Sequence, residues 1–324
     1  MMLVPYPTLL KPHQEKHVIH GVRGVLPTCR MVAMDSAPAH VTHVAGTGAH
    51  GNHGAHGAHG QRTKGHRGSR RIQFHAMAHQ IERPIATVKK MPNLGHMPIV
   101  FRSQSPAGSP KYSILCYGDS LTAGFCDKGM KFEPYGRTLA KMLGTLLKVP
   151  CEVLVCGHSG HTASEMVANM DQTTITDVGG QVGKGLRRSL MEMSRPLDLV
   201  LLMTGTNDIG KGVEPSAVLE DIIKLHEICK QHGVPSMALS PPPIPMNTDA
   251  EATRRQLRDL LAMWSSAGHV EGFVDPGQLV PSNCPKSWDP DRLHFSPEGS
   301  QLLGQQLANA VLPILRRKRA ASRA

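Results

Sequence analysis

The sequence lacks long apolar runs and has few aromatic residues. No segment approaches about 18 consecutive apolar residues, the minimum for a membrane-spanning helix, so we expect no transmembrane segment. Phe, Trp and Tyr make up only 4% of the 324 residues, although the net charge is +11. Because no aromatic residues are interleaved with the basic ones, we expect no nucleic-acid partner despite this charge.

Regularly spaced cysteines are also absent. The seven cysteines are an odd number, and their spacing fits neither a zinc site nor a disulfide scaffold. Cys116, Cys151 and Cys156 lie in or beside strand-like runs, where a free cysteine acts as a small buried hydrophobic residue. This usage favours a reducing compartment, and we expect a cytoplasmic protein.

The first 110 residues are poor in acids and have no long apolar period. They hold 3 Asp+Glu against 13 Lys+Arg, and 13 of the 19 histidines. Since little apolar area is available to offset ordering entropy, residues 1–110 are interpreted as a low-complexity, disordered segment. Residues 1–10 have too short an apolar run for a secretory signal. Organellar targeting stays open, because the segment is acid-poor but also serine-poor.

Histidine recurs at every third position from His50 to His59, separated by glycine and other small residues. Imidazoles at this density can bind Zn²⁺, Ni²⁺ or Cu²⁺ loosely, but the tract offers no defined ligand geometry. We therefore expect no fixed metal site. At the other end, residues 316–324 form a basic tail without acids. A solvated helix end is favoured there over a nuclear signal or a contact with an anionic surface.

Residues 111–315 are mildly acidic and alternate between strand and helix patterns. Strands are predicted at 112–117, 152–156, 197–203, 236–240 and 272–274. Helices are predicted at 135–147, 215–231, from Thr248 or Asp249 to about Ala267, and from Pro297 with Ser296 as N-cap. This alternation predicts an α/β fold, a three-layer α/β/α sandwich around a parallel five-stranded sheet. The glycine-rich residues 173–188 are interpreted as a mobile loop.

Four short polar segments end the predicted strands or follow them. Parallel strands bring their carboxyl ends to one edge of the sheet, where ligands bind. They are residues 118–121, 157–160, 205–208 and 291–294. Ser120 is the candidate nucleophile, because it follows an apolar strand that ends at a glycine. His294 is the candidate base and later acid, since imidazole titrates near neutral pH. Asp291 would orient that imidazole and stabilise its cation.

Donors to a developing oxyanion are also available. Gly160 can bring a backbone N–H close to a ligand because it has no Cβ. Asn207 offers a side-chain NH₂, and the N–H of Ser120 completes a three-donor oxyanion hole. Each residue alone is equally explained as part of an ordinary turn. The set of five together favours acyl transfer.

The blocks Gly-Asp-Ser-Leu, a glycine after the second strand, Gly-Thr-Asn-Asp and Asp-x-x-His resemble, in this order, the SGNH hydrolases or GDSL esterase/lipase family. The resemblance spans residues 113–315 and implies a flavodoxin-like fold. It implies Ser120 as nucleophile, His294 as base and Asp291 as its partner, with Gly160 and Asn207 as oxyanion donors. Residues 114–122, 197–200 and 239–246 resemble bacterial arylesterases with acyltransferase activity.

The expected function is a serine esterase that hydrolyses short-chain acyl or aryl esters through an acyl-enzyme. Acyl transfer or carbohydrate deacetylation at the same site stays open, as does a non-catalytic protein that binds metal or polyanions through its ends. We expect no cofactor, since no phosphate-binding or dinucleotide-binding glycine motif follows a strand. The expected partner is a small ester substrate, and the sequence leaves the oligomeric state undetermined.

Overall fold

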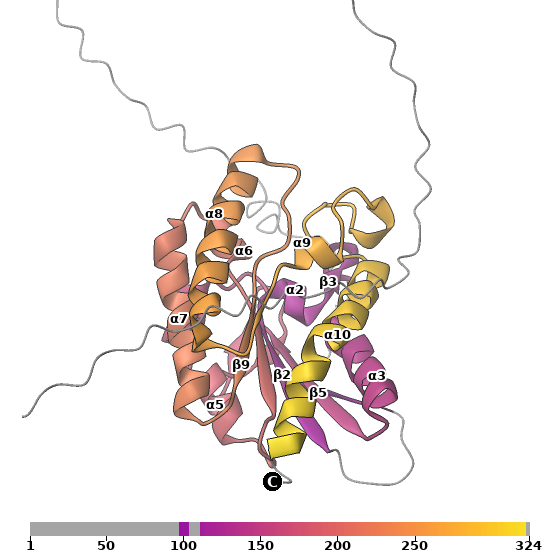
Figure 1. Cartoon of the computed structure of the whole chain (residues 1–324). Helices are drawn as coiled ribbons and strands as arrows, with labels where there is room; N and C mark the ends of the chain where they lie inside the picture. The colour runs from indigo at the N-terminus through magenta and orange to yellow at the C-terminus, as the bar shows by residue number, and fades with distance from the viewer. Residues whose placement is uncertain (1–96, 104–110, 322–324) are drawn as a thin grey trace, which may run out of the picture. The chain divides into compact units, whose positions relative to one another are not determined.

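The computed structural model describes residues 97–103 and 111–321, which build a sheet flanked by helices (Figure 1). Within these residues the main sheet has six strands in the order β1-β5-β2-β8-β9-β10. The strands are β1 (Ile99–Arg102), β2 (Tyr112–Gly118), β5 (Cys151–Gly157), β8 (Leu199–Met203), β9 (Ser236–Leu239) and β10 (Phe273–Val274). The pairs among β5, β2, β8, β9 and β10 are all parallel, which confirms the predicted five-stranded parallel sheet.

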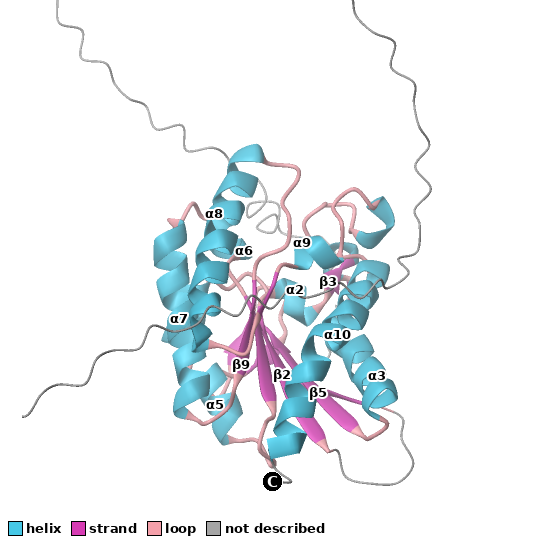
Figure 2. Cartoon of the chain, viewed as in Figure 1, coloured by secondary structure: helices cyan, strands magenta, loops and turns pink. Residues whose placement is uncertain are grey.

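Helices lie on both faces of this sheet, as Figure 2 shows by colour. The main helices are α3 (Tyr135–Leu147), α4 (Ala163–Ala168), α5 (Leu186–Met191), α7 (Pro215–Gln231), α8 (Thr248–Trp264) and α10 (Pro297–Ala321). Alternate side chains of β2 enter opposite layers of the core, as the twofold periodicity of a strand requires. Ile114 and Cys116 pack with α3 and α10, whereas Leu115 and Tyr117 pack with α5 and α7. The predicted three-layer sandwich is therefore confirmed.

The sheet begins earlier in the chain than predicted. Strand β1 runs antiparallel to β5, with Ile99 opposite Val155 and Arg102 opposite Glu152. The Arg102 guanidinium also lies 2.9 Å from the Glu152 carboxylate. The predicted domain start at residue 111 thus omits an edge strand that we had assigned to the disordered segment. Residues 1–96 and 104–110, which include the histidine tract, lie outside the described residues.

The carboxyl-terminal boundary at residue 315 falls inside a helix. Helix α10 continues to Ala321, across the first part of the predicted basic tail. Lys318 donates to the backbone oxygen of Asp198 at 2.9 Å, and Arg317 donates to the Glu271 carboxylate at 3.1 Å. These cations therefore have partners on the domain itself. No helix in the described ranges is long and apolar enough to cross a membrane.

The predicted helix starts are largely correct. Ser296 caps α10 by accepting the N–H of Gly299 at 3.1 Å. Helix α8 differs, because Asn247 is its N-cap and accepts the N–H of Ala250 at 2.9 Å. The choice of Thr248 or Asp249 as cap was wrong by one or two positions. Both lie inside the first turn, where an acid also suits the helix dipole.

The glycine-rich residues 173–188 have regular structure, in contrast to the predicted mobile loop. They form an antiparallel hairpin of β6 (Ile175–Thr176) and β7 (Val182–Gly183), followed by the start of α5. The predicted burial of cysteines is confirmed. Cys116, Cys151 and Cys156 are fully buried, and burial raises the pKa of each thiol to about 12, which keeps them protonated and unreactive.

Candidate active site

The candidate nucleophile sits in a tight turn at the carboxyl end of β2. A side chain at Gly118 would place its Cβ 2.0 Å from the backbone oxygen of Met203, so only glycine fits beside β8. Asp119 then caps the short helix α2 (Ser120–Ala123) by accepting the N–H of Leu121 at 3.0 Å. Ser120 is the first residue of this helix, and its N–H is one of those that a helix N-terminus leaves without an intrahelical partner.

The predicted base lies directly beside this serine, although the chain separates the two residues by 174 positions. The Oγ of Ser120 is 2.8 Å from Nε2 of His294. Nδ1 of His294 is 2.7 Å from Oδ2 of Asp291, whose Oδ1 accepts the backbone N–H groups of Leu293 and His294. The structure therefore joins Ser120, His294 and Asp291 in one hydrogen-bonded chain.

The electrostatics of Asp291 set the proton positions in this chain. Burial acts to raise its pKa, but hydrogen bonds and charge from His294, with the backbone N–H groups, lower the pKa of Asp291 from 3.8 to about 2. The carboxylate is thus charged at neutral pH and can accept a hydrogen from Nδ1 of His294. In the tautomer with its hydrogen on Nδ1, Nε2 of His294 has the lone pair that can accept the hydroxyl hydrogen of Ser120.

Phe125 is a contact of this site that the sequence did not reveal. It lies in β3 (Phe125–Cys126), which pairs with β4 (Lys131–Phe132). Its ring centroid lies 4.7 Å from that of His294. The half-buried ring packs against the imidazole at an interplanar angle of 43°. The residue follows the Gly-Asp-Ser-Leu block closely, but no local pattern shows that it would meet a histidine so distant in sequence.

The two further oxyanion donors predicted from the sequence lie on adjacent loops. Gly160 has φ of +80°, and a Cβ there would meet the Cγ2 of Val178 at 2.8 Å, so the position requires glycine. Asn207 lies in α6 (Thr206–Gly210) after β8 and donates through Nδ2 to the backbone oxygen of His161 at 2.9 Å. An amide nitrogen carries two hydrogens, so the second can reach a ligand. The structure therefore brings Asn207 against the turn of Gly160.

Two buried acids lie beneath these loops. Asp119 is fully buried, and burial raises its pKa from 3.8 to about 7 against the opposing effects of the Leu121 N–H and His294. Burial likewise raises the pKa of Asp208 to about 6, although its carboxylate accepts the N–H of Ala163. The sequence motifs contain both acids, yet composition alone gave no sign of their burial. Neither the Asp119 carboxyl nor the Asp208 carboxyl forms an ion pair within the described residues.

The raised pKa of Asp119 leads to a stability prediction. The folded state binds the carboxyl proton of Asp119 more tightly than the unfolded state does. The stability that this proton supplies is therefore complete below the unfolded-state pKa near 3.8, and it is lost as pH rises through the folded-state pKa of about 7. Asp119→Asn keeps an N-cap but cannot ionise. The melting temperature of the variant minus that of wild type should therefore increase by about 3 °C or more from about pH 5 to about pH 8.

Thermal unfolding of both proteins at the two pH values measures this effect. Asp171→Asn, at an exposed carboxylate, is the control and should show a smaller pH-dependent difference. A difference between Asp119→Asn and wild type that stays constant with pH would contradict the burial of a protonated carboxyl at this position.

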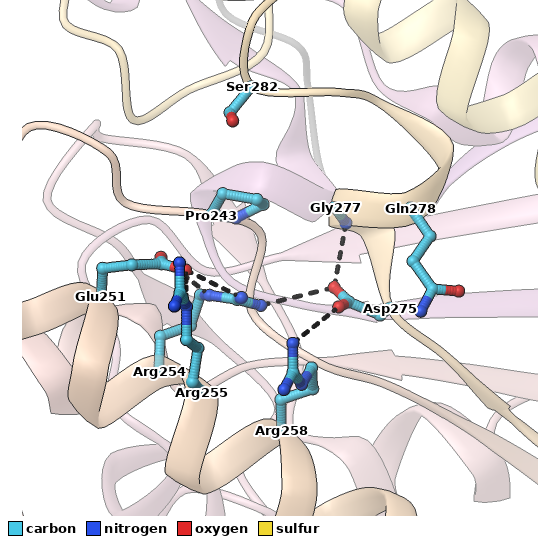
Figure 3. A pocket seen from close by; sticks show the side chains of 9 residues that line it. All are labelled: Pro243, Glu251, Arg254, Arg255, Arg258, Asp275, Gly277, Gln278 and Ser282. Atoms are coloured by element: carbon cyan, nitrogen blue, oxygen red, sulfur yellow. Dashed lines mark hydrogen bonds and ion pairs between the residues drawn. The ribbon is translucent and has the colours of Figure 1, made fainter.

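A separate polar pocket of about 360 Å³ lies beside α8 and the short helix α9 (Pro276–Leu279), which follows β10 (Figure 3). None of the five predicted site residues lines it. Arg254 is buried and makes two 2.9 Å hydrogen bonds to Glu251, and it lies 3.4 Å from Asp275. Arg255 and Arg258 also lie near acids. The positive charges of this pocket are therefore paired, and the network connects α8 to the end of β10.

Loss of the central guanidinium should be costly to stability. Arg254→Ala leaves the Asp275 carboxylate buried with a weaker set of partners, and we expect a loss of about 3 kcal/mol in the free energy of unfolding. Urea unfolding measures it. Arg255→Ala is the matched control, because that side chain is 64% exposed, and its loss should cost about 1 kcal/mol or less. Equal costs for the two variants would contradict a structural role for the buried pair.

The chain matches one known protein family over much of its length. The model of the GDSL-like lipase/acylhydrolase family matches residues 116–302. The match spans more than half of the chain. The chain belongs to this family. The membership confirms the resemblance to SGNH hydrolases, and it makes this protein a hydrolase of the esterase and acylhydrolase type.

Several solved structures are similar to this chain at low sequence identity. A GDSL-family lipolytic protein from Veillonella parvula is 19% identical, with 64% of this chain and 99% of that chain covered and a TM-score of 0.47. A GDSL-like lipase from Bacteroides thetaiotaomicron is 16% identical, with 74% and 98% covered and a TM-score of 0.46. A catalytic mutant of an acetylxylan esterase from Geobacillus stearothermophilus is 16% identical, with 63% and 94% covered and a TM-score of 0.47.

No curated protein sequence matches the chain significantly. Within the described residues, no group of three or more His, Cys, Asp or Glu side chains is arranged to hold a metal ion. The histidine tract of the N-terminal segment lies outside those residues, so the prediction that it holds no fixed metal remains a prediction. The same applies to the predicted roles of the five site residues, which motivate the proposal below.

Proposed function

We propose that this hydrolase is a serine esterase that cleaves carboxylic esters of short-chain acids or aryl alcohols through an acyl-enzyme. The observation that carries the proposal is the hydrogen-bonded chain from Ser120 Oγ through His294 to the charged carboxylate of Asp291. This arrangement supplies a nucleophile, a base within hydrogen-bonding distance and a group that orients the base.

In the first half-reaction, Ser120 Oγ forms a bond to the ester carbonyl carbon while Nε2 of His294 takes the hydroxyl proton. The alcohol oxygen then breaks its bond to that carbon and leaves with the same proton. In the second half-reaction, a water molecule attacks the acyl-enzyme while His294 again accepts a proton. The acid leaves, and the proton returns to Ser120. Asp291 stays ionised throughout and stabilises the imidazolium.

Negative charge on the carbonyl oxygen develops in both steps. The N–H groups of Ser120 and Gly160 and the second hydrogen of Asn207 Nδ2 are the proposed donors to this oxygen. Each such donor lowers the barrier by about 3 kcal/mol in a preorganised site. The position of Ser120 at the start of α2 and the contact of Asn207 with His161, the residue after Gly160, support this set of donors.

The proposed preference for small acyl or aryl groups rests on the resemblance of residues 114–122, 197–200 and 239–246 to arylesterases with acyltransferase activity. A series of p-nitrophenyl esters of increasing acyl length tests it. We expect the highest kcat/KM on acetate or butyrate. A maximum at long chains would contradict the size preference. Product analysis with an added alcohol or acetylated sugar separates hydrolysis from acyl transfer and deacetylation.

Fluorophosphonate labelling of the full-length protein tests the esterase proposal independently of the substrate. We expect one covalent adduct, which peptide mass spectrometry should locate at Ser120. An unlabelled Ser120 in folded protein would favour the non-catalytic alternative, a protein that acts through its histidine-rich and basic ends.

A further inference from the structure

The turn that carries Gly160 is held from outside by the tip of the β6–β7 hairpin, residues 177–181. Asp177 is 6% exposed, and its Oδ2 accepts the backbone N–H of Ser159 at 2.8 Å. Its Oδ1 accepts the N–H of Gln181 across the tip at 2.8 Å. The N–H of Val178 donates to the backbone oxygen of Ser159 at 3.3 Å. Both backbone polar groups of Ser159 are therefore bonded to the hairpin tip.

These bonds fix the direction of the neighbouring N–H. The carbonyl of Ser159 and the N–H of Gly160 belong to one planar trans peptide, in which the two groups point in opposite directions. Because Val178 holds the carbonyl toward the hairpin, the N–H of Gly160 points away from it. Withdrawal of electrons through the bonded carbonyl also strengthens that N–H as a donor.

The same peptide is the mobile part of this kind of turn. His161 donates to the backbone oxygen of His158 at 3.1 Å, and Gly160 occupies the third position with φ of +80°, as a type II turn requires. A type I turn has φ of about −90° at that position, and the two types differ by a flip of the central peptide. A flip here would reverse the N–H of Gly160 and break the hydrogen bond from the Val178 N–H to the Ser159 carbonyl.

The side chain of Val178 limits the turn further. Its two methyl carbons lie 2.8 and 3.0 Å from the point where a Cβ of Gly160 would be, so they pack against that residue. Val178 is nevertheless 64% exposed. The hairpin tip therefore contacts the turn through the Asp177 carboxylate, the Val178 N–H and the Val178 methyl groups.

We propose that Asp177 is a positioning residue that holds the Gly160 N–H toward the oxyanion. The proposal rests on the esterase function proposed above and adds to it a residue outside the four sequence blocks. A purely structural role for Asp177, in which it only closes the hairpin through Gln181, predicts a different outcome. Its loss would then lower stability without a selective effect on the transition state.

Asp177→Ala and Asp177→Asn test this in the full-length protein. Alanine removes both acceptor oxygens, whereas asparagine keeps one oxygen and so retains one of the two bonds. Asp171→Ala is the matched control, because this nearby acid is 62% exposed and pairs only with Arg187 in the described contacts. For each variant, kcat and KM on p-nitrophenyl acetate, inhibition by an alkyl boronic acid and the melting temperature are measured.

The boronic acid forms a tetrahedral adduct that mimics the transition state. For Asp177→Ala we expect kcat to fall by about 10- to 100-fold and boronate affinity to fall in parallel, since a misdirected donor loses its transition-state contact. KM should change by less than about threefold. Asp177→Asn should lie between alanine and wild type. A drop in kcat that merely follows the unfolded fraction, or unchanged boronate affinity, would overturn the proposal.

The ¹⁵N–¹H resonance of Gly160 provides a measure that needs no turnover. It should shift or split in Asp177→Ala and stay in place in Asp171→Ala. An unchanged Gly160 resonance in Asp177→Ala refutes the positioning role. Wild-type protein that turns over no ester, but shows the resonance change, instead contradicts the proposed function and leaves the positioning of Gly160 supported.

Discussion

Replacement of Ser120 by alanine should abolish ester turnover while the protein stays folded. Alanine lacks the Oγ that forms the bond to the acyl carbon. Without that bond, the remaining donors have no enzyme-bound oxyanion to stabilise. We expect kcat on p-nitrophenyl acetate to fall by about six orders of magnitude, as in other enzymes that lose a serine nucleophile. Fluorophosphonate labelling should disappear with it. Initial rates and intact-mass measurements check both results.

The fold should tolerate this change, because Ser120 contributes to α2 through its backbone and Asp119 provides the cap. The melting temperature should therefore stay within a few degrees of the wild-type value. Ser266→Ala is the control, since that exposed hydroxyl, just after the end of α8, bonds only to the Met263 carbonyl among the described contacts. Turnover by Ser120→Ala above about one part in a thousand of wild type would assign the nucleophile to another residue.

The sequence predicted elements best where local signals agree. Helix α7 was predicted with its observed bounds, because Pro215 marks its start and Gly233 follows its end. Helix α3 was predicted with the same accuracy from amphipathic spacing alone. The strands were correct to within a few residues, since their apolar runs are bounded by glycine, proline or polar residues.

Edge strand β1 could not be predicted in this way. It has four residues, and two partly buried residues alternate with two exposed ones in a pattern too short to recognise. Its existence depends on β5, a strand that the chain reaches only about 50 residues later. Pairing between distant segments stabilises such a strand, whereas local propensity is weak and context-dependent. The predicted domain start therefore fell one strand too late.

The same distinction applies to the site. Ser120, Gly160, Asn207, Asp291 and His294 could be proposed from the sequence because each lies in a short block with a recognisable chemical pattern, and parallel strands bring their carboxyl ends to one edge of the sheet. Asp177 and Phe125 were missed. Asp177 acts on Ser159 from a separate hairpin, and Phe125 meets His294 only through the tertiary fold. Residues that orient other residues carry no motif of their own.

Asp291→Asn should cost about four orders of magnitude in kcat while the geometry of the site is retained. The present carboxylate accepts from Nδ1 of His294 at 2.7 Å and so keeps Nε2 free to take the proton of Ser120. If the side-chain oxygen of the new asparagine still accepts the N–H groups of Leu293 and His294, its NH₂ group faces Nδ1 of His294. The imidazole would then carry its hydrogen on Nε2, where it cannot act as a base.

The measurement is kcat on p-nitrophenyl acetate for Asp291→Asn beside Asp289→Asn. Asp289 is a buried acid two residues away that accepts the N–H of Asp127, so its substitution tests general disturbance of the same loop. We expect Asp289→Asn to keep most of its activity. Equal activity of Asp291→Asn and wild type would mean that Phe125 and the backbone suffice to orient His294. A loss of activity in Asp291→Asn alone would instead mean that the carboxylate sets the tautomer on which proton transfer depends. The imidazole beside this carboxyl lowers its pKa and so keeps it charged.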